Sequence, residues 1–131
     1  MKPGNYTILL VDDDQDYLFQ LQTKIQNFGF KTITAEGQKE AELLMEKTKP
    51  DLAILDLMME NEDSGFLLAY KAKRKFPDMP IIIASAATAE TGFSFDMHNT
   101  DDRNWIKADL YLEKGIRSDQ LHREINKLLK L

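Results

Sequence analysis

Four short apolar stretches of this chain are each followed by polar side chains that could do chemistry. In chain order, these residues are Asp12, Asp13 and Asp14, then Asp56, then Ser85, and then Lys114. Carboxylates crowded together repel, and each disfavours ionisation of the next. A divalent cation opposite a lysine ammonium would offset that repulsion. Because the ligands on offer are all oxygen atoms, the cation indicated is a hard one, Mg²⁺.

A single aspartate at the end of a strand is more often a helix cap or a turn former than a ligand. Asp14 is the best candidate for a cap, because a helix is predicted to begin beside it. The combination of residues indicates more. An aspartate beside bound Mg²⁺ can act as a nucleophile and form an acyl phosphate. Transfer then needs mainly alignment and neutralised phosphoryl charge, to which Lys114 and the Ser85 hydroxyl would contribute.

The elements that would position these residues are indicated by the spacing of apolar side chains. Continuous apolar runs are typical of strands covered on both faces, and they predict strands at 8–11, 52–55 and 81–84. Two weaker runs predict strands at 31–35, which has β-branched residues, and at 109–112. Apolar residues three and four apart indicate amphipathic helices, which are predicted over 18–28, 41–48, 66–76 and 121–129. Ser118 and Asp119 are the predicted caps of the last helix.

Alternating strands and helices predict an α/β fold with a parallel sheet, right-handed crossovers and helices on both faces. Ligands of such sheets bind beyond the carboxyl ends of the strands, where the polar residues above would gather. The surplus length falls between Ser85 and Asp109. There the sequence predicts an irregular segment over 88–99 and a short helix over 100–107.

Length and composition exclude several classes of protein. The chain has 131 residues, 43% of them hydrophobic, and a net charge of −5, which fits one globular domain. The absence of cysteine excludes a disulfide scaffold, a cysteine-ligated zinc site and a thiol nucleophile. His98 and His122 lie far apart, and both are expected at the surface. No membrane span or secretory signal is recognised, so a cytoplasmic location is expected.

The sequence resembles the receiver domain of two-component response regulators. The stretches that carry the resemblance are residues 8–14, 50–59, 80–86 and 108–114. One such stretch would be weak support, but four in order at workable spacing are strong support, and the resemblance covers essentially the whole chain. The resemblance implies a flavodoxin-like, doubly wound sheet of five parallel strands in the order 2-1-3-4-5. The region between the fourth and fifth strands is longer than usual, so it is expected to be extended or irregular.

The resemblance also implies how the acidic residues divide the work. Asp56 would be the phosphoacceptor, and Asp12 and Asp13 would be the acidic pair, with Asp13 nearest the metal. Mg²⁺ would be the cofactor, held by Asp12, Asp13, Asp56 and the backbone carbonyl of Met58. Lys114 would bind the phosphoryl group.

The remaining implied roles concern signalling. Ser85 would move toward the phosphoryl group and Tyr111 would turn inward, which would alter the face formed by the fourth helix, fifth strand and fifth helix. The implied partners are a sensor histidine kinase or phosphotransfer protein and an unidentified downstream protein, with no nucleic acid or membrane. Residues 1–131 would form a single stand-alone receiver domain with no output domain. It would be a signalling protein and not a metabolic enzyme.

Some positions depart from the family pattern. Gly115 replaces the proline that usually follows the lysine, so the loop there is expected to be looser. Gly65 arrives about one residue late, which suggests an insertion in the loop before it. Met58 and Ala87 occupy the positions, two residues after the acceptor and two after the switch hydroxyl, at which side chains in the family tune the access of water to the acceptor. Neither has a polar group to orient water, so slow self-dephosphorylation is expected.

Three other functions fit parts of the sequence. A degenerate receiver would bind proteins without phosphate, which Gly115 and the altered fourth-helix region favour. A phosphohydrolase of the haloacid-dehalogenase type would use Asp12 and Asp14 as its Asp-x-Asp pair, but it would leave Asp56 idle. A flavin module shares the fold class, but three aspartates after the first strand would repel its phosphate.

Overall fold

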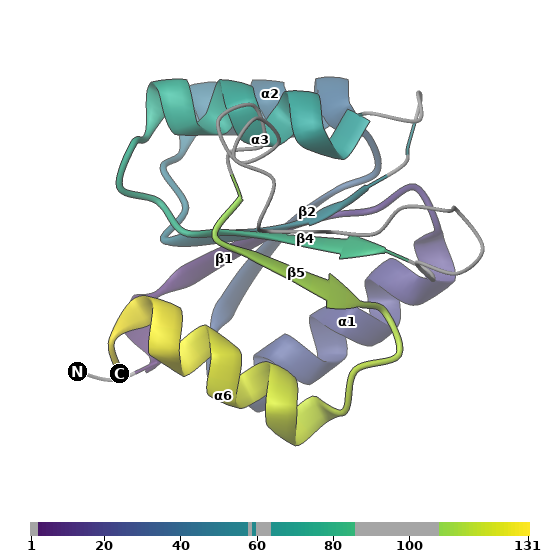
Figure 1. Cartoon of the computed structure of the whole chain (residues 1–131), viewed down its shortest axis with the longest axis vertical. Helices are drawn as coiled ribbons and strands as arrows, with labels where there is room; N and C mark the ends of the chain where they lie inside the picture. The colour runs from purple at the N-terminus through teal and green to yellow at the C-terminus, as the bar shows by residue number, and fades with distance from the viewer. Residues whose placement is uncertain (1–2, 58, 60–63, 86–107) are drawn as a thin grey trace, which may run out of the picture.

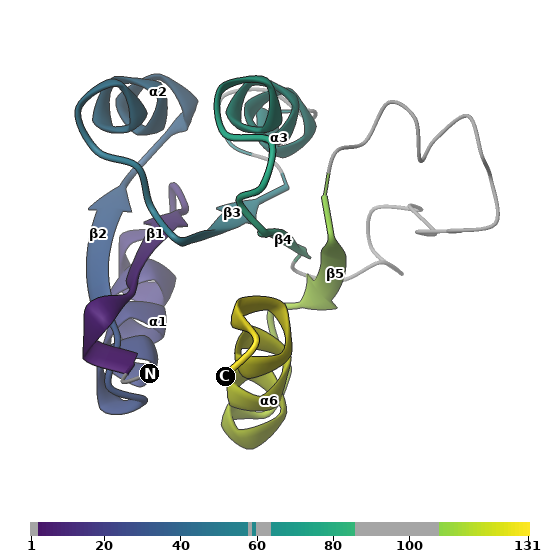
Figure 2. The same cartoon turned by 90° about the vertical axis from the view of Figure 1, so that its left-hand side faces the viewer.

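A single parallel sheet forms the centre of the computed structural model, which describes residues 3–57, 59, 64–85 and 108–131. The strands are β1 (Thr7–Val11), β2 (Lys31–Ala35), β3 (Leu52–Asp56), β4 (Ile81–Ser85) and β5 (Leu110–Glu113). The sheet crosses the middle of the molecule (Figure 1), and its strand order is β2-β1-β3-β4-β5 (Figure 2), with every neighbouring pair parallel. The predicted fold class and strand order are confirmed.

The helices are α1 (Gln15–Asn27), α2 (Gln38–Lys47), α3 (Ser64–Lys75) and α6 (Ser118–Leu129), and a 3₁₀ turn (Pro3–Asn5) precedes β1. Helices α2 and α3 cover one face of the sheet, and α1 and α6 cover the other (Figure 2). No helix in the described ranges is long and apolar enough to cross a membrane. The segment predicted to be irregular over 88–99 and the short helix predicted over 100–107 lie outside the described residues.

Burial on both faces explains why the three central strands, β1, β3 and β4, are rich in apolar residues. In β1, Leu9 and Val11 belong to the apolar cluster beneath α2 and α3. Ile8 and Leu10, which alternate with them, belong to the cluster beneath α1 and α6. The two clusters exclude water from these central strands, so their carboxyl ends are where polar side chains can emerge.

The ends of the helices test the predicted caps. The Asp14 carboxylate accepts the backbone N–H groups of Asp16 and Tyr17 at 3.1 and 3.2 Å, which confirms Asp14 as the cap of α1. The predicted caps of the last helix were wrong. The helix begins at Ser118, so Ser118 and Asp119 lie inside its first turn, and Arg117 occupies the cap position without a side-chain cap bond. The Asp119 carboxylate pairs with the Arg117 guanidinium at 2.9 Å.

Candidate functional site

The register of the sheet brings the predicted site residues to one edge. Val11 of β1 pairs with Leu55 of β3, so Asp12 and Asp56 each stand one residue further along neighbouring strands. Ser85, at the end of β4, pairs with Glu113 of β5, which immediately precedes Lys114. Strand ends that are far apart in sequence therefore converge, as the sequence predicted.

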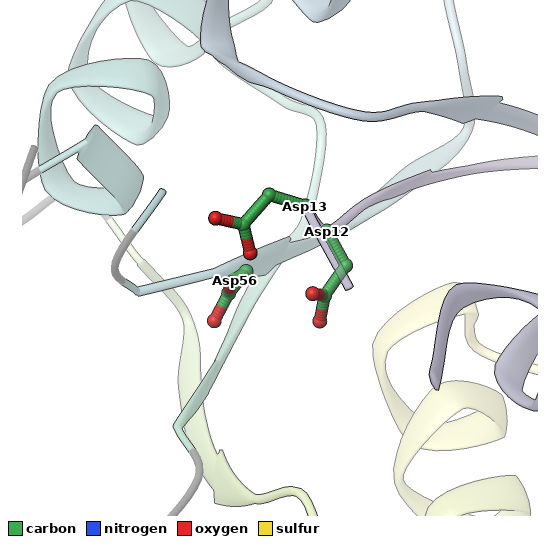
Figure 3. A group of neighbouring side chains, drawn as sticks. All are labelled: Asp12, Asp13 and Asp56. Carbon is green, nitrogen blue, oxygen red and sulfur yellow. The ribbon is translucent and has the colours of Figure 1, made fainter. Parts of the chain in front are cut away.

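Asp12, Asp13 and Asp56 form a compact group of carboxylates (Figure 3). Each offers one oxygen atom, and these atoms all lie within 4.8 Å of one another. Asp12 is only 2% exposed and Asp56 6% exposed, whereas Asp13 is exposed to solvent. The site therefore has two buried carboxylates and one at its mouth.

Lys114 supplies the positive charge on the other side of the group. Its ammonium nitrogen lies 2.8 Å from a carboxylate oxygen of Asp12 and 3.1 Å from one of Asp56. Its backbone N–H donates to the carbonyl of Ser85 at 2.8 Å, which ties the residue to the end of β4. One ammonium is thus shared between two buried carboxylates.

The electrostatics leave Asp56 with too little compensating charge. Burial raises the pKa of Asp56 from 3.8 to about 7, and the negative charges of Asp12 and Asp13 add to this rise, while the charge and hydrogen bond of Lys114 oppose it. Burial alone would lower the pKa of Lys114. The hydrogen bond to Asp12 and the charges of both carboxylates outweigh burial and raise it. Lys114 is therefore a firmly charged cation, and it offsets only part of the repulsion.

These features fit a hard divalent cation. The donor set consists of carboxylate oxygens within 4.8 Å of one another, which is the chemistry that Mg²⁺ prefers. Because the pKa of Asp56 is raised, further positive charge beside the three carboxylates would stabilise the ionised form of Asp56. Met58, whose backbone carbonyl was the fourth predicted ligand, lies outside the described residues.

Asp14 does not join the acidic group. Its backbone N–H donates to the Asp12 carboxylate at 2.9 Å, and its own carboxylate caps α1. The Asp12–Asp14 pair that a dehalogenase-type phosphohydrolase would use is therefore split between the site and a helix cap. Asp56, which that function would leave idle, is at the centre of the site.

Gly65 has a role at the site that its sequence position did not reveal. A Cβ atom there would overlap the carbonyl oxygen of Asp56 and would lie 2.7 Å from the Cα atom of Leu57. The Gly65 N–H donates to the Leu57 carbonyl at 2.8 Å. Glycine thus lets the first turn of α3 approach the backbone of Asp56 closely. A glycine soon after a strand end was the available signal, but only the packing shows what it approaches.

The two predicted switch residues lie on neighbouring strands. Ser85 is buried at the end of β4. Tyr111, in β5, is half-buried and packs against the cluster beneath α2 and α3. Its ring meets that of Phe66 edge-on, with 6.5 Å between the centroids. The structure therefore places Tyr111 partly inward, next to the first turn of α3.

Tyr17 is a neighbour of the site that the sequence did not single out. It is half-buried in the first turn of α1, and the Lys114 ammonium lies over its ring, 4.7 Å from the centroid. Burial raises the pKa of the Tyr17 hydroxyl, Lys114 opposes this rise, and Asp12 and Asp56 add to it. The only sequence signal was an aromatic residue three positions after a predicted cap.

Comparison with protein families and curated proteins gives consistent matches. Residues 8–126 match the family model of the response regulator receiver domain. The response regulator SaeR of Staphylococcus aureus is 34% identical over 122 residues, which cover 93% of this chain and 50% of SaeR. The chain thus spans about half the length of the curated relatives it matches.

Solved structures agree with this match. The response regulator TrrA of Thermotoga maritima, solved in complex with Mg²⁺-BeF, is 30% identical with a TM-score of 0.77 over 94% of this chain and 98% of TrrA. The receiver domain of Francisella response regulator 1452 is 28% identical with a TM-score of 0.77 over 96% of this chain and 98% of that domain. A CheY-like receiver from Methanospirillum hungatei shares the fold, with a TM-score of 0.79 at 23% identity over 95% of this chain and 94% of its own.

Proposed function

Because this chain belongs to the family of response regulator receiver domains, we propose that it accepts a phosphoryl group on Asp56 and uses it as a signal. The observation that carries the proposal is the convergence of Asp12, Asp13 and Asp56 within 4.8 Å, with Lys114 paired to two of them. Residues 1–131 would act as one receiver domain.

The transfer follows from the groups at the site. A carboxylate oxygen of Asp56 attacks the phosphorus atom, a new O–P bond forms, and the bond from phosphorus to the donor's nitrogen or oxygen breaks. The leaving group takes that electron pair. Lys114, 3.1 Å from Asp56, neutralises charge on the phosphoryl oxygens, and the buried Ser85 hydroxyl donates a hydrogen bond to one of them. Alignment and charge neutralisation are the main requirements of this chemistry.

Mg²⁺ would be held by the carboxylates of Asp12, Asp13 and Asp56. The backbone carbonyl of Met58, which lies outside the described residues, would be the fourth ligand. When bound, the ion supplies positive charge to the phosphoryl oxygens. The complex of TrrA with Mg²⁺-BeF supports the same choice of ion for this chain. Attack requires an ionised Asp56, and a cation beside Asp56 lowers the pKa that burial has raised to about 7. Binding the ion and preparing the nucleophile are therefore linked.

The proposed output is a shift at Ser85 and Tyr111. Phosphorylation adds negative charge and strong hydrogen-bond acceptors at Asp56, toward which Ser85 would move. Tyr111, already packed edge-on to Phe66, would then turn further inward. Such a two-state element would change the surface around β5 and α6, where an unidentified downstream protein would bind.

The proposed upstream partner is a sensor histidine kinase or a phosphotransfer protein. The phosphoryl group, once on Asp56, would be lost slowly. This expectation rests on Met58 and Ala87, which have no polar group to orient water and which lie outside the described residues. A half-life of seconds in the purified protein would contradict slow loss. A marked shortening in Ala87→Glu would support the role assigned to that position.

Incubation with acetyl phosphate tests the proposed function. Intact mass spectrometry should show one added phosphoryl group in the wild-type protein when Mg²⁺ is present and none when EDTA replaces it. Asp56→Asn should remain unlabelled, whereas Asp78→Asn, a change at an exposed turn, should be labelled like the wild type. Absence of labelling would favour a phosphate-independent interaction module. Labelling that persists in Asp56→Asn would show that the acceptor is another residue.

A further inference from the structure

Tyr17 is held in place by contacts on three sides. The Asp14 carboxylate accepts its backbone N–H at 3.2 Å, which fixes the first turn of α1. The side chain packs against the apolar cluster beneath α1 and α6. The Lys114 ammonium lies over its ring at 4.7 Å. A ring anchored in this way presents a fixed π face to the cation.

Lys114, by contrast, has a flexible stem of four carbons and two competing acceptors. Its ammonium lies 2.8 Å from Asp12 and 3.1 Å from Asp56. The next residue is Gly115, where an added Cβ would meet nothing within 4 Å. Backbone bonds hold the turn around it, from Ile116 N–H to the Glu113 carbonyl and from Lys114 N–H to the Ser85 carbonyl, but they fix the main chain and not the end of the Lys114 side chain. The Tyr17 ring is a rigid contact of the ammonium that carries no charge, and it does not compete with either carboxylate.

We propose that Tyr17 is a positioning residue of the phosphoacceptor site, whose ring holds the Lys114 ammonium where the phosphoryl oxygens will arrive. The inference rests on the proposed function of Asp56. Tyr17 acts through Lys114: an ammonium that already stands beside Asp56 needs no reorganisation when charge develops on the phosphoryl group. In this chain, a side chain of α1 thus restrains the end of the Lys114 side chain, in addition to the backbone bonds that hold its main chain.

The central test compares initial rates of labelling by acetyl phosphate with Mg²⁺ at saturation. Tyr17→Leu keeps an apolar side chain but removes the π face, and the rate should fall about 3- to 30-fold, the range of a partly desolvated cation–π contact. Tyr17→Phe keeps the ring and should recover most of that loss. Tyr70→Leu is the matched control, because Tyr70 is exposed on α3 and lies 5.8 Å from the Arg74 guanidinium. Its rate should equal that of the wild type.

A double-mutant cycle separates positioning from a general structural effect. In a Lys114→Gln background, Tyr17→Leu should cause no further loss beyond about 2-fold, since the cation through which Tyr17 acts is gone. Losses that multiply independently would overturn the proposal, as would equal rates for wild type and Tyr17→Leu. Circular dichroism of each variant checks the fold.

A nuclear magnetic resonance measurement on the unphosphorylated wild-type protein tests the contact between Tyr17 and Lys114 without any variant. The ring current of Tyr17 should move the ε-proton resonances of Lys114 upfield of those of an exposed lysine such as Lys47. An ordinary shift for Lys114 would overturn the inference. If the wild-type protein is not labelled at all, the proposed function fails while this resonance still reports on the contact. If the wild type is labelled and Tyr17→Leu labels equally fast, only the inference fails.

Discussion

Replacing Asp56 with asparagine should stabilise the metal-free chain above neutral pH. Burial and the charge of Asp12 raise the pKa of Asp56 from 3.8 to about 7. Between those two values the folded chain holds a proton that the unfolded chain has lost. Because the folded state binds more protons, the free energy of unfolding falls as pH rises through this interval. The stability from this group is complete below about pH 4 and lost above about pH 7.

The size of the effect follows from the same shift. A rise from 3.8 to about 7 corresponds to about 4 kcal/mol, at about 1.4 kcal/mol per pKa unit. Asparagine resembles the neutral, protonated side chain and therefore avoids this penalty. The hydrogen bond that Lys114 donates at 3.1 Å is already included in the net shift, because it opposes the rise of the Asp56 pKa. We therefore expect Asp56→Asn to gain a few kcal/mol at about pH 8, and markedly less at about pH 5.

Urea denaturation followed by circular dichroism in EDTA measures this difference. The control is Asp78→Asn, which makes the same change in an exposed turn between α3 and β4 and should show no gain that grows with pH. A destabilised Asp56→Asn at the higher pH, or an equal difference from wild type at both values, would refute the electrostatic reasoning.

Three further predictions concern the ion, the helix cap and two glycines. Mg²⁺ should bind more weakly as pH falls below about 7, because protons compete for Asp56. Calorimetry in buffers of different ionisation enthalpy should show that binding releases protons, and an affinity that does not depend on pH would contradict the proposed site. Asp14→Ala should destabilise the chain by about 1 kcal/mol with Mg²⁺ affinity unchanged, and a large loss of affinity would make Asp14 a ligand. Gly65→Ala should destabilise the folded chain by about 1–3 kcal/mol, whereas Gly115→Ala should stabilise it by about 0.4–1 kcal/mol. Thermal unfolding measures both changes, and effects of the same sign would contradict the packing described for these two glycines.

The sheet and the acidic group were predictable because they depend on strong local signals. Runs of apolar or β-branched residues located every strand to within a residue or two, and parallel strands place their carboxyl ends at one edge. Asp12 and Asp56 had to meet once β1 and β3 were neighbours, and that order came from the family resemblance. Lys114 followed from its position after the last strand.

The remaining features depend on contacts between distant residues. The role of Gly65 appears only when the start of α3 lies against the backbone of β3. Tyr17 and Lys114 are far apart in sequence, and their contact follows from the packing of α1 beside the sheet edge. His122, expected at the surface, stacks on Phe28 with 4.1 Å between the ring centroids. Local patterns contain no information on such pairs.

Chemical trapping of the acyl phosphate tests the central claim most directly. Borohydride reduces an aspartyl phosphate to homoserine, and peptide mass spectrometry then locates the modified position. After incubation with acetyl phosphate and Mg²⁺, homoserine should appear at position 56 and disappear when EDTA is added first. Modification at another aspartate such as Asp12 or Asp13, or none in the folded protein with Mg²⁺ bound, would contradict the account.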